Sequence, residues 1–327
     1  MPEFSIIIAT AGESDSALEH KLENTLSLSR THSFEVLVFS DGHTLPESLA
    51  REPSVSLHRF PRQGKTACQN QCAEKAQGSI LLFTDVTADL EPDCLDALAN
   101  AFIDPAVAAV GGWFEYRFKS ANMEGGYLSI EHLIKSLQSR AGAVIGYFGP
   151  LYSVRKENYQ PMPAFYCSDL MLPLTVINQN HLTRMEPRAR SWRALDRPMG
   201  AELERKRRIV AQAASSVAHF LWQNPGFPFR HPFAFGLLLA FKVLRWMVPL
   251  IGIAVLIGLL ILQPIWGAAV LGGSLVLVLL SKIASQALSL RRVQLPYYCW
   301  LVGVGGLLGL YDALRGNRYA DWEPGRR

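Results

Sequence analysis

The chain has 327 residues, a formal net charge of +4 at pH 7 and 49% hydrophobic residues. This length is more than one small core needs and allows two domains. The basic residues cluster beside apolar segments without an aromatic or zinc-finger pattern, which argues against a nucleic-acid-binding protein and favours contact with anionic lipid.

Hydrophobicity is distributed unevenly along the chain. Apolar and polar segments alternate up to about residue 230, as in a water-soluble α/β protein, whereas residues 233–314 are mostly Leu, Ile, Val, Gly and Ala. We therefore expect an α/β domain over residues 1–228 and a membrane-attachment region over residues 229–327. Five scattered cysteines, none in a Cys-x-x-Cys pair, and no signal peptide before the first strand predict a domain that stays in the cytoplasm.

Three apolar segments in the first 90 residues, 4–10, 34–40 and 80–83, predict buried strands. The third runs into the acidic stretch FTDVTADLEP, residues 83–92. Ligands of open α/β sheets bind at the carboxyl ends of the strands, so Asp85 and Asp89 are predicted to face a metal or a nucleotide. The alternative is an ordinary turn or helix-capping aspartate.

Between the second and third strands, the segment RQGKT resembles the end of a phosphate-binding loop. That motif needs a glycine five positions before Gly64, where the chain has Arg59, so the segment does not match it. Lys65 instead opens a predicted helix, and a lysine at a helix start can bind a diphosphate by charge together with the backbone amides. The alternative is a solvated surface lysine.

Further along, residues 107–118 predict a pair of strands, residues 123–140 a helix with an apolar stripe, and residues 170–177 an amphipathic helix that begins after Asp169. From Phe4 to about Val210 the chain resembles the family 2 glycosyltransferases, which transfer sugars from nucleotide donors with inversion. The motifs that carry the resemblance, in order, are SIIIATAGE (5–13), VLVFSDG (36–42), QGKTACQN (63–70), LLFTDVTADLEPDCL (81–95), FGPLYSVRK (148–156), CSDLMLPL (167–174) and ERKRRIVAQ (204–212).

This resemblance implies the GT-A fold, a Rossmann-like mixed sheet flanked by helices, and a donor site along its edge. Thr10 and Glu13 would contact the donor, although Glu13 also suits the first turn of a helix. Asp41 would hydrogen-bond the uracil or the ribose, and Lys65 would meet the diphosphate.

The family's acidic motif is Asp-x-Asp, and its second carboxylate binds the divalent metal, Mn²⁺ or Mg²⁺, on the donor. Here the triplet is Asp85-Val86-Thr87, and a hydroxyl is a poorer ligand for a hard cation than a carboxylate. Three possibilities remain open: Asp85 holds the metal with donor oxygens and water, Asp89 substitutes, or the dependence on metal is weak.

On the acceptor side, the resemblance implies that Gly149 admits the acceptor sugar, Arg155 braces the loop and Asp169 is the catalytic base. The family has two adjacent acids at the base, and the first is Ser168 here. The Gln-x-x-Arg-Trp motif of processive synthases is absent near residues 205–208, which favours transfer of a single sugar. In that basic run, Arg207 or Arg208 is expected near the diphosphate.

In the membrane region, residues 233–246 predict an interfacial helix whose Lys242 and Arg245 reach toward water. Residues 247–262 and 265–280 predict two spans, separated at Gln263-Pro264, and the basic residues that follow favour the cytosolic side. For residues 297–314 three possibilities stay open. This segment is re-entrant, or residues 233–246 themselves span the membrane, or the positive-inside rule fails here.

Together these features predict a membrane-attached inverting glycosyltransferase of hexosyltransferase type whose catalytic domain lies in the cytoplasm. It would move one sugar from a nucleoside-diphosphate sugar, with a UDP-sugar favoured, to a polyprenyl-linked or glycan acceptor in exopolysaccharide or cell-surface glycan synthesis. The alternatives are a processive synthase of the same fold and a non-catalytic nucleotide-sugar-binding subunit, which Thr87 and Ser168 favour.

Overall fold

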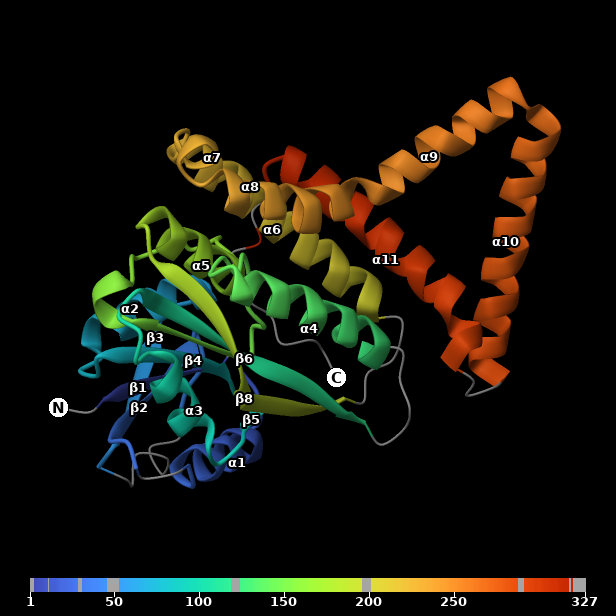
Figure 1. The fold of residues 1–327 in the computed structure, drawn as a ribbon. Helices are drawn as coiled ribbons and strands as arrows, with labels where there is room; N and C mark the ends of the chain where they lie inside the picture. The colour runs from blue at the N-terminus through green and yellow to red at the C-terminus, as the bar shows by residue number, and fades with distance from the viewer. Residues whose placement is uncertain are drawn as a thin grey trace.

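The computed structural model describes residues 3–10, 12–28, 31–45, 53–118, 124–195, 201–287, 291–317 and 319. Its centre is an eight-stranded mixed sheet with the strand order β3-β2-β1-β4-β7-β6-β8-β5 (Figure 1). The strands are β1 (Phe4–Thr10), β2 (Phe34–Asp41), β3 (Val55–Phe60), β4 (Ile80–Asp85), β5 (Asp89–Leu90), β6 (Val107–Phe118), β7 (Leu151–Arg155) and β8 (Leu182–Leu195).

Helices cover both faces of this sheet and then continue into a long helical region. Those that belong to the α/β part are α1 (Asp15–Leu26), α2 (Lys65–Lys75), α3 (Cys94–Ala101), α4 (Glu124–Arg140), α5 (Ser168–Asn178) and α6 (Ala201–Gln223). Those that follow are α7 (Phe227–Arg230), α8 (Pro232–Leu238), a π-helical turn (Leu239–Val243), α9 (Leu244–Leu262), α10 (Pro264–Ala287) and α11 (Arg291–Leu314).

The parallel half of the sheet explains the continuous apolar runs in the sequence. Strand β1 lies between β2 and β4, parallel to both, and all seven of its residues are buried. Its side chains alternate between two cores, with Ile7 in the core formed with α2 and α5 and Ile6 in the core formed with α1 and α3. A strand covered on both faces has no polar face, so the period-two alternation disappears.

The carboxyl ends of these strands meet at one edge of the sheet, as the sequence predicts. Ala9 lies opposite Asp85, and Thr10 lies opposite Ser40, the residue before Asp41. Strand β7 then pairs with β4 in the antiparallel sense and joins the parallel half to β6 and β8. The mixed GT-A-like sheet that the sequence predicts is therefore confirmed.

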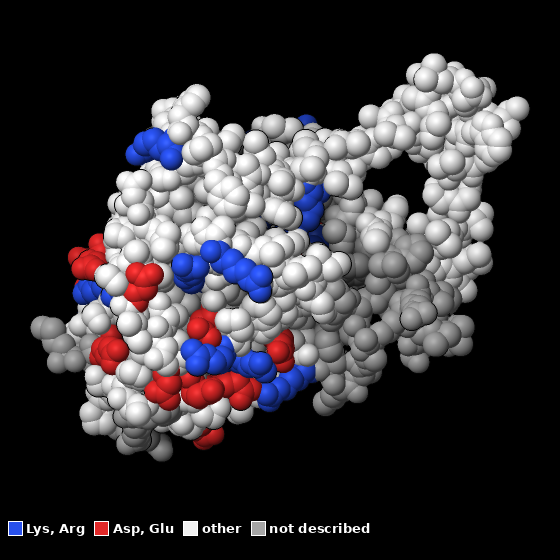
Figure 2. Space-filling view, in the orientation of Figure 1, with Lys and Arg blue, Asp and Glu red and all other residues white. Residues whose placement is uncertain are grey.

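Beyond α7, two helices are long and apolar enough to cross a membrane. They are Pro232–Leu262, with a mean hydropathy of 2.3 and 6% buried, and Pro264–Ile283, with a mean hydropathy of 1.9 and 11% buried. Helices α9 and α10 stand away from the sheet (Figure 1), and the outer part of this arm shows neither blue nor red in the view of Figure 2.

The start of this arm differs from its predicted form. Residues 233–246 do not make a separate interfacial helix, because the chain continues as one helix from Pro232 to Leu262. Its two cations turn toward the α/β part: Arg245 forms an ion pair with Glu131 of α4, and Lys242 lies beside Gly146. The break at Gln263-Pro264 is present, since α9 ends at Leu262 and α10 begins at Pro264.

Residues 297–314, for which the sequence left three possibilities open, belong to α11, which runs back from α10 and packs along α6 (Figure 1). The helices approach closely at two glycines one helical turn apart. A Cβ at Gly305 would lie 3.0 Å from the Leu203 carbonyl oxygen, and one at Gly309 would lie 2.5 Å from that of Arg207. Small residues at this spacing let helix backbones touch.

An ion pair with a buried carboxylate reinforces the contact between α6 and α11. The Arg207 guanidinium donates to both carboxylate oxygens of Asp312, at 2.6 and 3.0 Å, and the Tyr319 hydroxyl donates to the same carboxylate at 2.7 Å. Asp312 is 2% exposed. The α/β part and the helical arm are thus joined by direct helix packing.

We expect Gly309→Ala to destabilise the protein relative to Gly306→Ala. A Cβ at Gly306 meets nothing within 4 Å, whereas one at Gly309 meets the backbone of α6. Both changes replace a helical Gly by Ala and gain the same helix propensity. The difference between the two variants in free energy of unfolding therefore reports overpacking, which typically costs about 1–3 kcal/mol. Thermal unfolding of the two variants in detergent measures it, and equal melting temperatures would contradict the close approach.

Candidate functional site

The candidate site lies at the edge where β1, β2 and β4 end. Thr10 is 2% exposed, and its hydroxyl donates to the Glu13 carboxylate at 2.8 Å. Asp41, also 2% exposed, ends the neighbouring strand. The structure therefore brings the three residues predicted for the base and ribose side of the donor to one stretch of the sheet edge.

Asp41 fixes the loop that leads into α2. Its carboxylate accepts hydrogen bonds from the backbone amides of Gln63, at 2.7 Å, and Gly64, at 3.1 Å. Gly64 has φ +94°, a conformation that other residues rarely adopt, and no side chain caps α2. The Asp41 carboxylate at the end of β2 thus binds the backbone amides just before α2, and Lys65 becomes the first residue of that helix.

Lys65 reaches across the edge to the acidic turn. Its ammonium lies 2.5 Å from Asp85 Oδ1, and the two side chains are 21% and 19% exposed. Burial lowers the pKa of Lys65, but the charge of Asp85 and the hydrogen bond to it outweigh burial, so the pKa is raised overall. The lysine therefore keeps its charge inside the site, as a diphosphate ligand must.

Asp169 belongs to the same electrostatic neighbourhood, because its charge also raises the pKa of Lys65. It lies in the first turn of α5 and is half-buried. Its Oδ1 is 2.9 Å from the Cys167 thiol, and a Cβ added at Gly149 would lie 3.3 Å from its Oδ2. Burial and the charge of Asp169 raise the pKa of Cys167 well above its usual range, so the thiol stays protonated and donates.

Ser168, where the family has an acid, belongs to a buried polar network. Its hydroxyl lies 2.8 Å from the Tyr152 hydroxyl, which accepts a hydrogen bond from Gln69 at 2.9 Å. Tyr152 is 1% exposed and stacks on Phe83 of β4. A carboxylate in this enclosed place would be costly, and the neutral hydroxyl links β7 to α2 and α5 at no such cost.

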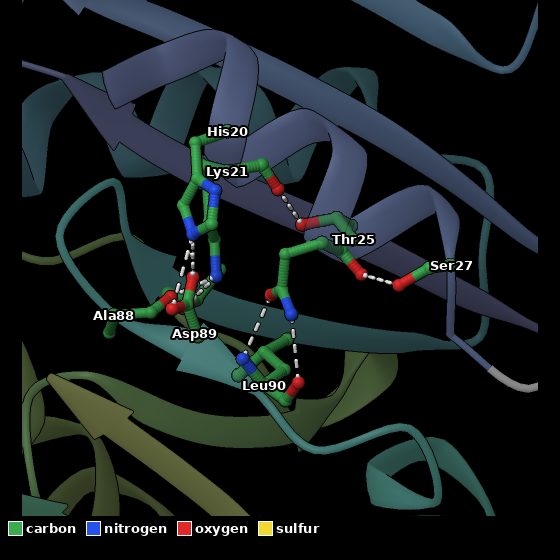
Figure 3. Close-up of polar contacts among 9 residues, drawn as sticks. His20, Lys21, Thr25, Ser27, Ala88, Asp89 and Leu90 are labelled. Atoms are coloured by element: carbon green, nitrogen blue, oxygen red, sulfur yellow. Dashed lines mark hydrogen bonds and ion pairs between the residues drawn. The ribbon is translucent and has the colours of Figure 1, made fainter. Parts of the chain in front are cut away.

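Behind the acidic turn, α1 supplies a buried lysine that the motifs did not reveal. The Lys21 ammonium donates to the Ala88 carbonyl (Figure 3) and to the Thr84 hydroxyl at 3.2 Å. Lys21 is 0% exposed. Asn24 donates to and accepts from the backbone of Leu90. These contacts fix the turn that carries Asp85. Lys21 lies in a polar helical pattern, so nothing in the sequence distinguishes it from a surface residue.

Asp89, predicted as a possible metal ligand, faces the same helix. Its carboxylate lies 3.1 Å from the imidazole of His20 (Figure 3). The Thr87 hydroxyl accepts a hydrogen bond from Arg193 at 3.2 Å. Across the described residues, no group of three or more His, Cys, Asp or Glu side chains could hold a metal ion. A metal role for Asp85 or Asp89 therefore stays a prediction.

Two of the predicted arginines lie in very different surroundings. Arg155 donates from Nε to the Val107 carbonyl at 2.9 Å and from Nη2 to the Phe102 carbonyl at 2.5 Å, which braces the segment between α3 and β6. The Arg207 guanidinium is bound by Asp312 in the contact with α11. The structure does not bring Arg207 to Lys65 and Asp85, and the role of Arg208, next to it on α6, stays a prediction.

Comparison with known proteins agrees with this architecture. Residues 5–160 match the sequence profile described as "Glycosyl transferase family 2". A search of curated proteins found no match. The predicted resemblance to this family is thus confirmed over residues 5–160.

Among solved structures, the chain is similar to a mannosyltransferase, PcManGT from Pyrobaculum calidifontis, solved with GDP-Man and Mn²⁺. The TM-score is 0.67 at 20% identity, over 96% of this chain and 87% of that one, so the shared fold extends into the C-terminal helices. A weaker similarity, with a TM-score of 0.47 at 13% identity over 59% of this chain and 44% of that one, is to GalNAc-T7 solved with UDP, GalNAc and Mn²⁺.

The buried Lys21 predicts a pH dependence of stability. Burial lowers its pKa from 10.5 to about 8 in the folded protein, so between these values the unfolded chain binds more protons, and stability rises with pH. From pH 7 to pH 9.5 the wild type should gain about 2 kcal/mol in unfolding free energy relative to Lys21→Met.

Thermal unfolding of both proteins in detergent at the two pH values provides the measurement. Lys75→Met removes an exposed lysine of α2 and is the matched control. A stability difference between wild type and Lys21→Met that stays constant with pH would show that Lys21 is not buried as a charge behind the turn. An equal pH dependence of the difference between wild type and Lys75→Met would show the same.

Proposed function

Because residues 5–160 match glycosyl transferase family 2, we propose that the protein transfers a single sugar, with inversion, from a nucleoside-diphosphate sugar to an acceptor at the membrane. The observation that carries this proposal is the Lys65–Asp85 ion pair at the carboxyl edge of the sheet, with Asp169 close enough for its charge to act on the same lysine.

On the donor side, Lys65 would bind the diphosphate. Its ammonium is already charged and largely enclosed, and a donor phosphate can replace Asp85 as its partner. A fixed cation stabilises the negative charge that grows on the departing diphosphate. Thr10, Glu13 and Asp41 would hold the nucleoside end, and we favour a UDP-sugar as the donor.

On the acceptor side, Asp169 would remove the proton from the attacking hydroxyl. Its Oδ2 lies beside Gly149, where the missing side chain leaves space for the acceptor, while its Oδ1 is held by the Cys167 thiol. A hydroxyl that attacks the anomeric carbon from the face opposite the diphosphate inverts the configuration. One base and one leaving-group cation are enough for this single displacement.

A divalent ion bound with the donor would be held by Asp85 and by the donor's own phosphate oxygens. Mg²⁺ commonly takes one or two protein carboxylates together with substrate phosphates and water, so one aspartate is compatible with such a site. The ion would neutralise the diphosphate. The similar mannosyltransferase structure, solved with GDP-Man and Mn²⁺, is consistent with this arrangement.

The apolar arm supports a place at the membrane. Two helices that could span a bilayer follow directly on the α/β part, and α11 returns to it. We propose that this part lies on the cytosolic face and that the acceptor is a polyprenyl-linked or glycan molecule of exopolysaccharide or cell-surface glycan synthesis. The proposed hexosyltransferase type follows from the resemblance to the family.

Substituting the two acids should separate donor binding from transfer. Asp169→Asn should keep nucleotide affinity and lower single-turnover transfer about 10²–10⁴-fold, because an alcohol attacks poorly without a base. Asp85→Asn should weaken nucleotide binding as well, because it removes the carboxylate that would hold the divalent ion on the diphosphate and that positions Lys65 before the donor binds. The measurements are nucleoside diphosphate affinity and transfer in a single turnover, for both variants.

Asp93→Asn is the matched control, since this carboxylate is exposed beside the acidic turn. It should leave both quantities near the wild-type values. Near-normal transfer by Asp169→Asn would refute the base assignment, and unchanged nucleotide affinity in Asp85→Asn would place the donor elsewhere.

A further inference from the structure

A cavity lined by both charged and apolar side chains lies between α4 and the start of the apolar arm. Its volume is about 90 Å³, several times the ~10–15 Å³ that one water needs. A π-helical turn, a feature frequent at functional sites, forms part of its wall. The polar side chains that line it are Glu131, Lys135, Gln138, Lys242 and Arg245.

The lining carries more positive than negative charge. Three of these side chains are cations, and the single carboxylate, Glu131, forms its ion pair with Arg245. The Lys135 ammonium donates to the Gly146 carbonyl, a neutral acceptor. Across the described residues, the Lys242 ammonium has no hydrogen-bond acceptor. Two lysines therefore face the cavity without a carboxylate bound to them.

Enclosing this charge has a cost that an anion would remove. Lys135 is 4% exposed, and burial, helped by the charges of Lys242 and Arg245, lowers its pKa to about 7 against the opposing charges of Glu131 and Asp169. Buried cations need a partner to offset desolvation. A phosphate in the cavity would supply the negative charge that both lysines lack and the hydrogen-bond acceptor that Lys242 lacks.

The cavity adjoins the proposed catalytic base. A Cβ at Gly146 would lie 3.5 Å from Lys242 Nζ, and the next backbone amide, that of Tyr147, donates to the Asp169 carbonyl at 2.8 Å. The charge of Asp169 also acts on Lys135. An anion held here would lie on the acceptor side of the site.

Exposed apolar side chains lie on the same helix as part of the cavity lining. On α4, Ile130, Leu133 and Leu137 are 60%, 62% and 55% exposed, and they belong to the helix that supplies Glu131, Lys135 and Gln138. The helix that supplies Lys242 and Arg245 continues directly into the apolar arm. Charged side chains and exposed apolar side chains thus lie close together on these two helices. A lipid with an anionic head group needs both kinds of surface.

We propose that this cavity binds the phosphate group of the lipid that carries the acceptor. The inference rests on the proposed function and specifies its acceptor as a phosphate-bearing lipid. Lys135, Lys242 and Arg245 hold the phosphate, the exposed face of α4 and the apolar arm accommodate the chain, and the acceptor's hydroxyl extends toward Asp169.

Full-length protein in detergent tests this with farnesyl monophosphate as the probe, and with farnesol and inorganic phosphate as comparisons. The wild type should bind farnesyl monophosphate more tightly than either. Lys242→Gln and Lys135→Gln should each weaken that binding about 10- to 100-fold, the usual range for a lost charged hydrogen bond. Lys242→Arg, which keeps the positive charge, should retain most of the affinity for farnesyl monophosphate. Lys282→Gln, on α10 away from the cavity, should leave that affinity unchanged.

Nucleoside diphosphate affinity, measured on the same samples, separates this inference from the proposed function and reports that each variant is folded. If the nucleotide binds but Lys242→Gln leaves farnesyl monophosphate affinity unchanged, the inference is wrong and the proposed function stands. Equal affinity for farnesol would also overturn it, and equal affinity for inorganic phosphate would assign the cavity to free phosphate. A wild type that binds farnesyl monophosphate but no nucleotide would contradict the donor site alone.

Discussion

The ion pair between Lys65 and Asp85 depends on two supports, and the rest of the site is arranged around it. Asp41 holds the backbone amides just before α2, which fixes the base of the lysine, and Lys21 holds the turn that carries Asp85. Pulling one charge away from a largely buried pair leaves the other uncompensated, which is strongly unfavourable. A donor diphosphate can replace the carboxylate as partner, so the pair keeps the cation charged and in place until the donor arrives.

A second constraint joins the α/β part to the apolar arm. The close contact at Gly305 and Gly309 and the ion pair of Arg207 with the buried Asp312 tie α11 to α6. The arm therefore leaves the α/β part through α8 and returns to it through α11. Lys242 and Arg245, at the start of the arm, reach the cavity beside Asp169 through this geometry, so the position of the arm also shapes the acceptor side.

The features predictable from the sequence are those set by local pattern. Apolar runs ending in Thr10, Asp41 and Asp85 predicted the strands and their shared edge, because parallel strands bring their carboxyl ends together. Lys21 could not be found this way, since its partners lie more than 60 residues away and its burial depends on how α1 packs. The same holds for Arg245, whose partner Glu131 is 114 residues distant. A cation on an apolar helix suggests snorkelling to lipid phosphates, and only the fold shows that it turns inward.

The two carboxylates of the site differ in their partners, and this difference supports their different roles. Asp85 Oδ1 is bound by an ammonium ion, which neutralises it and suits an electrostatic part in donor binding. Asp169 Oδ1 is bound by a thiol, a neutral donor that orients the carboxylate without cancelling its charge, and Oδ2 faces the space at Gly149. A general base must be oriented yet still able to accept a proton, and a direct ammonium partner would hinder that. When two nearby acids have such different partners, one of them can supply stabilising charge while the other transfers a proton.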